Sequence, residues 1–441
     1  MKKAAGRKKR IQVSNNNEPV EKKKKTGKHQ MNEKRTVFPR KPGYMIAILL
    51  MALLTGAFLV MLILTDVLPP DVTVILACAS VALLLFTCLM FSAGRRWKRI
   101  AGIFICIIAV VVMGFVTSFM GNTYAMFNSI SESDFNATGP AAKRVDPTEE
   151  PFSIYITGID QWECDEGLDL ERSDVNMIMT VNPKTKKILL TSIPRDSYVK
   201  LHTAQQMDKL THTGVYGVDE TLNTVHDWLG IDLNYYVKLN FSAARDIIDA
   251  MDGIKVYSPV TFQSSLQGYW YEKGWNKIGG TKALYFARER HAFEGQDSIR
   301  VENQQRVIEA IITKMTSSTT LLTKYGDIMA AAGKNLSTNM PAEDMTALVK
   351  MQLTDLAEWD VQTQKIEGEY DMDYVASLTQ SQKFSVYKTD NASSAKCVNA
   401  IRDITNPPVS ELEAADKNKS KSFIVNMTNK AIETIKEKIG R

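Results

Sequence analysis

Residues 152–196 read FSIYITGIDQWECDEGLDLERSDVNMIMTVNPKTKKILLTSIPRD and contain three short apolar runs separated by polar residues. The runs are Phe152–Ile159, Val175–Val181 and Lys187–Ile193, and their β-branched and aromatic residues are typical of buried strands. The second and third runs flank Asn182-Pro183-Lys184, whose turn-forming residues predict a hairpin. This stretch therefore predicts the centre of a β-sheet.

Beyond these strands, helix-like and strand-like patterns alternate as far as about Ile404. The mixture predicts a layered α/β domain whose sheet holds both parallel and antiparallel pairs. No internal repeat is evident. The expected helices are Asp219–Leu229, Ala243–Met251, Thr281–Glu289, Asp297–Met315 and Pro341–Leu353, and the expected strands are Tyr235–Leu239 and Ile254–Val260.

Three uncharged, apolar stretches precede the domain: Gly43–Thr65, Val72–Gly94 and Ile100–Met120. Each exceeds the roughly 20 residues that a helix needs to cross a membrane. Helices of a soluble core rarely run this long without a charge. A cleaved signal peptide does not fit either, because a long charged segment precedes the first stretch and two more stretches follow it. Three transmembrane helices are therefore expected.

Charge sets the expected orientation. Residues 1–42 carry a net charge of +12, and the loop Arg95–Arg99 is also basic, whereas the loop Asp66–Asp71 has no Lys or Arg. The positive-inside rule then places the N-terminus in the cytoplasm and the domain outside the cell. The basic tail could also suggest nucleic-acid binding, but it has no interleaved aromatic residues and a membrane follows at once. We therefore expect contact with membrane lipid and no nucleic acid.

The predicted organisation follows from these patterns. Because the linker is short, we expect the domain's site to lie beside the membrane. Cys164 and Cys397 are both expected outside the cell, where a disulfide can persist, and their pairing stays open. The segments are a basic cytoplasmic tail (1–42), three transmembrane helices (43–120), an extracellular linker (121–151), the domain (152–405, with its motifs in 152–315) and a basic C-terminal tail (406–441).

Polar residues gather in bursts at the ends of the predicted elements, where α/β domains place their sites. Several arginines with two strand-end aspartates suit a phosphate group and a divalent cation, because Arg grips phosphate oxygens bidentately and Mg²⁺ prefers carboxylate oxygens. Any one of these residues alone could instead form a surface salt bridge. The bursts are Gly158–Asp160, Arg172–Asp174, Ile193–Asp196, Lys209–His212, Ala287–His291 and Gln296–Gln305.

In order and spacing together, these motifs resemble the LytR–CpsA–Psr family of bacterial cell-envelope phosphotransferases. The resemblance covers about residues 152–315 and implies a layered α-β-α domain with a mixed central sheet. It also implies Mg²⁺-dependent transfer of a glycopolymer from a polyprenyl-pyrophosphate carrier to peptidoglycan, which forms a phosphodiester. The three-span anchor resembles the capsule-assembly branch of that family.

The resemblance also assigns roles to residues. One departure is that the stretch between Asp160 and Asp174 is about two residues longer than the family's pattern and includes Cys164. The identity of the catalytic base stays open, with Asp297 one option. The implied roles are catalytic for Arg288, Arg290 and Asp297, substrate-binding for Arg195, Lys209, Arg300 and Gln304, and Mg²⁺-binding for Asp160 and Asp174.

Two other functions remain open at this point. The same residues could hydrolyse a lipid pyrophosphate with water as the acceptor, or the chain could be a membrane-anchored envelope regulator or binder without turnover. The sequence does not identify the polymer, which could be capsule polysaccharide, teichoic acid or another wall polymer, and it gives no oligomeric state. We expect a Gram-positive host.

Overall fold

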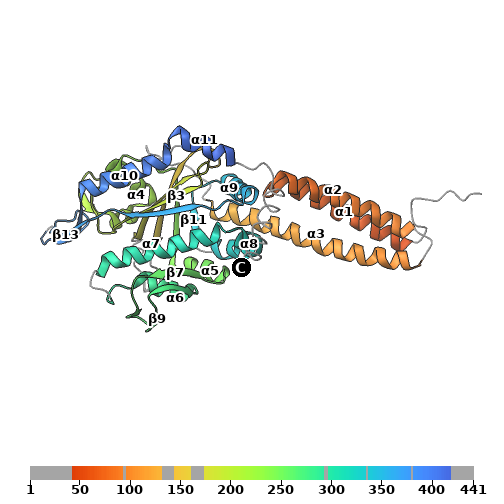
Figure 1. The fold of residues 1–441 in the computed structure, drawn as a ribbon, viewed down its shortest axis with the longest axis horizontal. Helices are drawn as coiled ribbons and strands as arrows, with labels where there is room; N and C mark the ends of the chain where they lie inside the picture. The colour runs from red at the N-terminus through yellow and green to blue at the C-terminus, as the bar shows by residue number, and fades with distance from the viewer. Residues whose placement is uncertain are drawn as a thin grey trace, which may run out of the picture.

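The computed structural model describes residues 42–92, 96–131, 144–159, 173–292, 296–333, 336–378 and 381–418. Within these ranges a bundle of three apolar helices joins a layered α/β domain end to end (Figure 1). Most of the two predicted basic tails, 1–42 and 406–441, lies outside the described residues.

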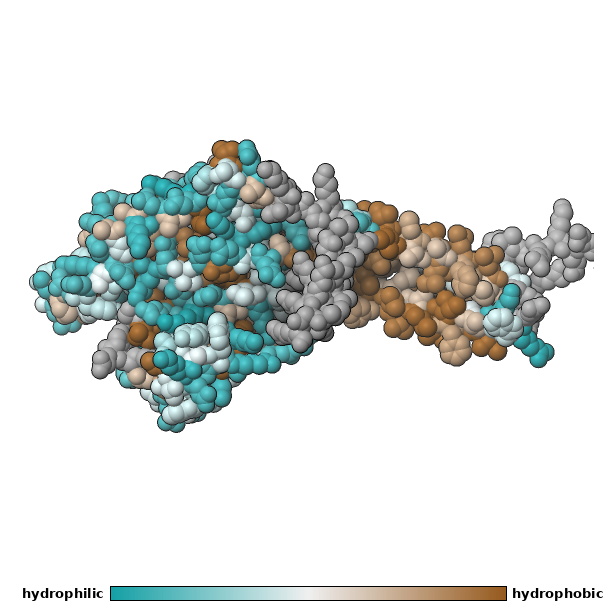
Figure 2. Space-filling model, in the orientation of Figure 1, coloured by the Kyte–Doolittle hydropathy of each residue, from teal (hydrophilic) through white to brown (hydrophobic). Residues whose placement is uncertain are grey.

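The bundle consists of α1 (Pro42–Thr65), α2 (Pro70–Ser92) and α3 (Arg96–Ile130), and each helix is long and apolar enough to cross a membrane. Its outward faces are apolar as well: Ile63 is 76% exposed and Phe115 is 72% exposed. Figure 2 shows the contrast between this brown surface and the mostly teal surface of the domain. Such a surface is unfavourable in water, so the bundle anchors the chain in a membrane.

The predicted linker over 121–151 is wrong in its first part, because α3 continues to Ile130. Its last turns are not apolar throughout, but Met126, Phe127 and Ile130 share one face and are buried in the domain core. At 35 residues the helix is far longer than a span requires. α3 therefore runs without a break from the bundle into the domain core.

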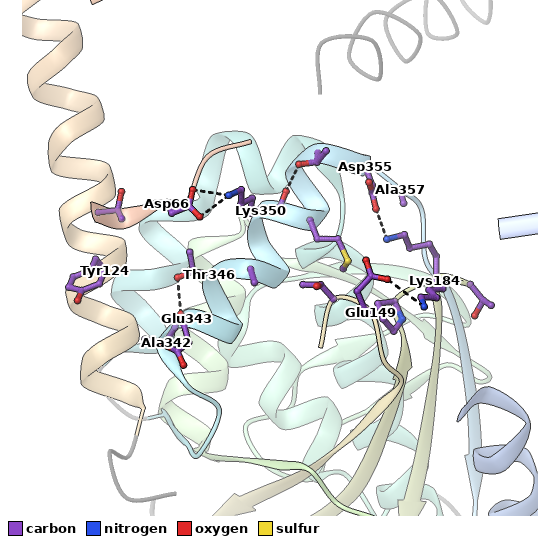
Figure 3. A pocket seen from close by; sticks show the side chains of 18 of the residues that line it. Asp66, Tyr124, Glu149, Lys184, Ala342, Glu343, Thr346, Lys350, Asp355 and Ala357 are labelled. Carbon is purple, nitrogen blue, oxygen red and sulfur yellow. Dashed lines mark hydrogen bonds and ion pairs between the residues drawn. The ribbon is translucent and has the colours of Figure 1, made fainter. Parts of the chain in front are cut away.

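A second contact holds the domain against the bundle. Asp66, in the turn between α1 and α2, accepts hydrogen bonds from Lys350 Nζ at 2.7 and 2.8 Å through its two carboxylate oxygens. Lys350 lies on α9 (Ala342–Asp355). Between these parts lies a cavity of about 910 Å³, with Tyr124 of α3 on one wall and Lys184 near the other (Figure 3).

The central sheet has six strands in the order β11-β6-β1-β2-β3-β12. The β2–β3 hairpin, β1–β2 and β6–β11 are antiparallel, whereas β1–β6 and β3–β12 are parallel, so the predicted mixed sheet is confirmed. The strands are β1 (Phe152–Ile159), β2 (Ser173–Asn182), β3 (Lys187–Ile193), β6 (Tyr235–Asn240), β11 (Leu336–Thr338) and β12 (Asp360–Lys365).

Alternating side chains of the strands build two apolar layers. Tyr155 and Ile178 face α4 (Val218–Leu229) and α10 (Asn391–Thr405). Ile154 and Ile156 belong to the opposite layer, against α7 (Gln296–Met315) and α9. Because successive residues of a strand point to opposite faces, one strand supplies both layers. The predicted α-β-α arrangement is confirmed (Figure 1).

A third apolar cluster lies beyond α7 and receives the end of α3. Here α5 packs so closely on α6 that a Cβ atom at Gly280 would lie 2.2 Å from the carbonyl oxygen of Arg245. The remaining elements are α5 (Phe241–Ala250), α6 (Gly280–Arg288), α8 (Ser318–Ala332), α11 (Val409–Asn418), the 3₁₀ helix η1 (Leu210–Tyr216), and the hairpins β4 (Tyr198–Lys200) with β5 (Met207–Lys209), β7 (Ile254–Ser258) with β10 (Gly274–Ile278), β8 (Phe262–Gln263) with β9 (Trp270–Tyr271), and β13 (Gly368–Asp373) with β14 (Phe384–Thr389).

Candidate functional site

The pairing of β2 with β3 brings two of the predicted motifs to the same end of the sheet. Asn176 of β2 pairs with Ile193 of β3, so the start of β2 lies beside the end of β3. Asp174 comes two residues before Asn176 and Arg195 two residues after Ile193, so the two side chains meet at this end of the sheet. Arg195 Nη1 donates to Asp174 Oδ1 at 2.5 Å. Two residues that lie 21 positions apart are thus joined by strand pairing.

A network of charges extends from this pair. Arg195 Nε lies 3.6 Å from Asp196 Oδ2, and Lys209 Nζ lies 3.2 Å from Asp196 Oδ1. Each of the four side chains is only 16–29% exposed. Partial burial strengthens ion pairing relative to a fully exposed pair, so these contacts stabilise the four side chains next to one another.

Backbone hydrogen bonds fix Lys209 in the network. Lys209 ends the β4–β5 hairpin, and the next two residues donate from their amides to Ser197 O and Arg195 O, each at 2.9 Å. The hydroxyl of Thr211 also donates to Ser173 O at 2.9 Å. The loop after β3 and the start of β2 are therefore both tied to η1.

A buried carboxylate lies directly behind Lys209. Asp208 is fully buried and accepts from the amides of Lys209 and Ser377 and from His212 Nδ1. Burial by itself raises the pKa of Asp208, but the hydrogen bonds from His212, Lys209 and Ser377 outweigh it, and the pKa lies below its usual value. This cluster fastens the chain after β13 to β5.

The same cluster is not a Ser–His–Asp relay. Asp208 and the hydroxyl of Ser377 both contact Nδ1 of His212, at 2.7 and 2.8 Å. A relay needs the base to contact its nucleophile through one ring nitrogen and its carboxylate through the other. His212 therefore holds the hairpin in place.

Arg288 lies near the same end of the sheet, on the side of the third apolar cluster, which α5 and α6 help to form. It is the last residue of α6, is half-buried, and its guanidinium lies 5.6 Å from the centre of the Phe241 ring. Phe241 packs with Val175, which follows Asp174 in β2. Contact between a guanidinium and an aromatic face is a favourable cation–π interaction, and it fixes where this charge lies.

Glu289 organises the turn that follows Arg288. Its carboxylate is buried and accepts from the amides of Arg290, His291 and Ala292 and from the amide and hydroxyl of Ser265. Burial opposes the charge, yet the hydrogen bonds from Ser265 and from the turn hold the pKa of Glu289 below its usual value. Arg290 itself is exposed, and its Nε lies 3.2 Å from His291 Nε2.

The predicted residues of α7 lie on the same side of the sheet as α6, opposite the face that η1 covers. Arg300 is half-buried, and Gln304, one turn later, is only 7% exposed. The neighbouring Gln305 donates to Leu190 O and Gln364 O, which fixes α7 across β3 and β12. Asp297 is the second residue of α7, but its side chain lies outside the described residues, as does the whole of Asp160.

Two buried polar atoms near this crossing have no hydrogen-bond partner among the described residues: Ser192 Oγ of β3 and Asn303 Nδ2 of α7. Leaving a buried polar group unpaired costs about 1–3 kcal/mol, so such groups call for an explanation. Ser192 lies on the face of β3 that α7 covers, whereas Asn303 lies one turn before Val307, on the face of α7 that packs in the third apolar cluster. The two atoms therefore lie in different layers.

The site lies at the end of the sheet away from the helix bundle. The β2–β3 turn, at the opposite end of these strands, lines the cavity beside Asp66 and Tyr124. Since β2 has ten residues and a strand rises about 3.3 Å per residue, roughly 30 Å separates the two ends. The expectation that the site lies beside the membrane is therefore wrong. It rested on the length of the linker, but the site's distance from the bundle depends on the direction of the strands.

The donor set is compatible with Mg²⁺ in its chemistry. Asp174 and Asp196 supply hard carboxylate oxygens at the same end of the sheet, and Mg²⁺ often takes only one or two carboxylates. Among the described residues, no group of three or more His, Cys, Asp or Glu side chains converges. The magnesium prediction stays a prediction, since Asp160 lies outside those residues.

Cys397 lies buried on α10, has no disulfide partner among the described residues, and its Sγ lies 3.5 Å from Lys365 O. It packs in the apolar layer with Val398 and Ile401. Cys164 lies outside the described residues, so the predicted pairing stays open.

Three residues of the site region had no role in the sequence prediction. Asp196 and Glu289 lie within two of the predicted motifs, Ile193–Asp196 and Ala287–His291. Their position next to arginines in these motifs could have predicted them. Asp208 precedes a quoted motif, but its partner Ser377 is 169 positions away, and no local pattern predicts that contact.

Comparisons with known proteins place these features in context. The LytR_cpsA_psr family pattern matches residues 118–402. The Bacillus licheniformis protein named polyisoprenyl-teichoic acid–peptidoglycan teichoic acid transferase TagU is 34% identical over 215 residues, 48% of this chain and 64% of that protein. The Enterococcus faecalis protein of the same name is 32% identical over 262 residues, 58% of this chain and 82% of that protein.

One solved structure, that of Bacillus subtilis TagV, is 26% identical with a TM-score of 0.49 and covers 58% of this chain and 98% of that chain. The match to the Bacillus licheniformis protein spans slightly less than two thirds of that protein's length.

Proposed function

The chain belongs to the LytR_cpsA_psr family, whose pattern covers residues 118–402, and we propose that it transfers a lipid-linked anionic glycopolymer to peptidoglycan through a phosphodiester bond. The donor is the polymer on a polyprenyl-pyrophosphate carrier. Teichoic acid is the proposed polymer, since both TagU relatives carry it in their names. The domain lies outside the membrane of a Gram-positive cell, with the N-terminus in the cytoplasm.

One observation carries the proposal. Asp174, Arg195 and Lys209 come from three separate elements and meet at one end of the sheet. Arg288 lies near that end, on a fourth element, through its contact with Phe241. Cations gathered from distant parts of a chain, and half-buried, are suited to a pyrophosphate, whose charge must be held away from bulk water.

The chain's own residues would act as follows. Arg195, Lys209, Arg288 and Arg300 bind pyrophosphate oxygens and stabilise the charge that grows as a sugar hydroxyl attacks the phosphorus linked to the polymer. The new bond joins that hydroxyl oxygen to phosphorus, and the bond to the departing polyprenyl phosphate breaks. We propose that Asp297 takes the hydroxyl proton, that Arg290 contacts the polymer side of the pyrophosphate, and that Gln304 lines the site.

Magnesium is part of the proposal. Asp160 and Asp174 would hold the ion, because hard carboxylate oxygens suit it. When bound, Mg²⁺ would neutralise charge on the pyrophosphate oxygens. Asp174 would then serve both the ion and Arg195, with which it is already paired.

The test is a transfer assay with the full chain in lipid nanodiscs, supplied with polyprenyl-pyrophosphate-linked polymer with and without a peptidoglycan acceptor. We expect Arg288→Ala to lower the transfer rate by about 10²–10³, the usual loss when one charge-stabilising group is removed. Arg402→Ala, an exposed position on α10, is the matched control and should transfer at the wild-type rate.

Two results would contradict the proposal. Wild-type rates for Arg288→Ala would remove the arginine from the site. Equal release of polyprenyl phosphate with and without acceptor, and no polymer joined to peptidoglycan, would identify a hydrolase instead.

A further inference from the structure

A second cavity, of about 500 Å³, lies between η1, α4 and the turn after β4. Its lining includes His202, Thr203, Tyr216, Asp219 and Asn223. None of these residues belongs to the motifs assigned to the pyrophosphate.

One face of α4 holds the cavity wall in a fixed form. Glu220, Thr224 and Asp227 stand at i, i+4 and i+7 and all face the same turn. Glu220 accepts from the amide and hydroxyl of Thr203, Thr224 Oγ1 accepts from the amide of His202 at 3.1 Å, and Asp227 lies 2.7 Å from His202 Nδ1. The cavity is therefore preformed, as binding sites usually are.

Asn223 is a buried polar group that the fold leaves incompletely bonded. Its side chain lines the cavity and is 6% exposed, and Oδ1 has no hydrogen-bond partner among the described residues. An unpaired buried amide oxygen is costly, and a hydroxyl or amide donor of a ligand would satisfy it.

Tyr216 supplies an aromatic face at the cavity. It is the last residue of η1 and is 59% exposed, although a tyrosine ring normally buries much of its area. An exposed aromatic ring beside polar groups is suited to a sugar ring, which has apolar faces and a polar rim.

The charges of the cavity select against an anionic ligand. Asp219 and Glu220 line it, and none of its described lining residues is Lys or Arg. A polymer with a phosphodiester backbone would be repelled, whereas the hydroxyl groups of an uncharged sugar can donate to carboxylates. The cavity therefore fits a neutral saccharide better than the anionic donor.

η1 links this cavity to the pyrophosphate site. Its first residues are hydrogen-bonded to Ser197 and Arg195, Lys209 directly precedes it, and Tyr216 ends it. Seven residues of 3₁₀ helix rise about 14 Å. That separation lets a short oligosaccharide lie in the cavity with a further hydroxyl near Arg195.

We propose that this cavity is a saccharide subsite that binds a neutral N-acetylhexosamine unit of the acceptor glycan. The inference rests on the proposed transferase function, because that function supplies the acceptor. Tyr216 stacks on a sugar ring, Asn223 accepts a hydrogen bond from the sugar, and Asp219 accepts from its hydroxyls.

The test is calorimetric titration of the full chain in nanodiscs with an uncharged N-acetylglucosamine tetrasaccharide and, separately, with a glycerol-phosphate polymer. We expect Tyr216→Ala to weaken tetrasaccharide binding about 10-fold. Asn223→Leu removes the amide at similar volume and should weaken it as well. Tyr257→Ala removes another exposed tyrosine, 43% exposed on β7, and should bind the tetrasaccharide as the wild type does.

Equal tetrasaccharide affinity in the wild type, Tyr216→Ala and Asn223→Leu would overturn the proposal. So would binding of the anionic polymer that Tyr216→Ala abolishes, because the cavity would then belong to the donor. If the wild type binds the tetrasaccharide through Tyr216 but transfers no polymer in the assay above, the saccharide site stands and the proposed function fails.

Discussion

The two ends of the central sheet hold charged residues in different ways. At the end beside the helix bundle, Lys350–Asp66 and Lys184–Glu149 each join one base to one acid, and Asp66 is 72% exposed. Lys186–Asp355 at the same end is also a one-to-one pair, although these side chains are only 21% and 15% exposed. At the other end, Asp196 contacts both Arg195 and Lys209, and those side chains are 16–29% exposed.

We propose that the difference separates structural charges from functional ones. One-to-one pairs with an exposed partner contribute little free energy each, and of those named here Lys350–Asp66 joins the domain to the bundle. A shared, half-buried network is suited to receiving a ligand. The larger of the two cavities described above lies at the first end, whereas the residues proposed to hold the pyrophosphate lie at the second.

The largest expected effect comes from breaking the network. Arg195→Ala should lower transfer by about 10²-fold or more, because it removes a charge-stabilising group and leaves Asp174 without its partner. Transfer rates and circular dichroism of the same preparation check this. An active Arg195→Ala enzyme would show that the network is structural, like the pairs at the other end.

An intermediate effect is expected on stability at Glu289. Glu289→Gln should destabilise the domain by about 1–3 kcal/mol at pH 7, because five donors lose a charged acceptor. The pKa of Glu289 lies below its usual 4.5 in the folded state, so its stabilisation is present above that value and is lost as the pH falls through the folded pKa.

The difference in unfolding free energy between wild type and Glu289→Gln should therefore shrink below about pH 4.5. Urea unfolding between pH 7 and pH 3.5 measures it. A difference that stays constant over this range would mean that the carboxylate charge does not hold the turn.

The smallest effect is expected at the bundle end. Lys350→Ala removes a pair with the exposed Asp66 and should cost no more than about 1 kcal/mol, less at high salt. Thermal unfolding in nanodiscs at two salt concentrations checks this. A loss of transfer as large as that of Arg195→Ala would contradict the division of roles between the two ends.

Much of the fold follows from local patterns in the sequence. The predicted bounds of β1 and β3 coincide with the observed ones, because both strands are buried on two faces and their apolar runs are continuous. β12 was not predicted as a strand of the central sheet. Its sequence, DVQTQK, is polar and half-exposed at the sheet edge, and its pairing with β3 is a long-range contact.

The site was predictable in its members more than in its position. Arg195, Lys209 and Arg288 stand in motifs that local reading finds, but which side of the domain they face depends on how α3 docks. That docking rests on Met126, Phe127 and Ile130, whose helical spacing continues past the apolar span. The predicted third transmembrane helix ended at Met120, where polar residues begin, so this docking of α3 in the domain was not predicted.

We propose that the pyrophosphate binds at the end of the sheet away from the bundle. It can be tested with a spin label at Lys200→Cys, beside the network, or at Lys184→Cys, in the β2–β3 turn, after replacement of the five native cysteines. Phosphorus resonances of bound polyprenyl pyrophosphate are then recorded for each label. We expect strong broadening from the label at residue 200 and little from the label at residue 184. Strong broadening from residue 184 alone would contradict it.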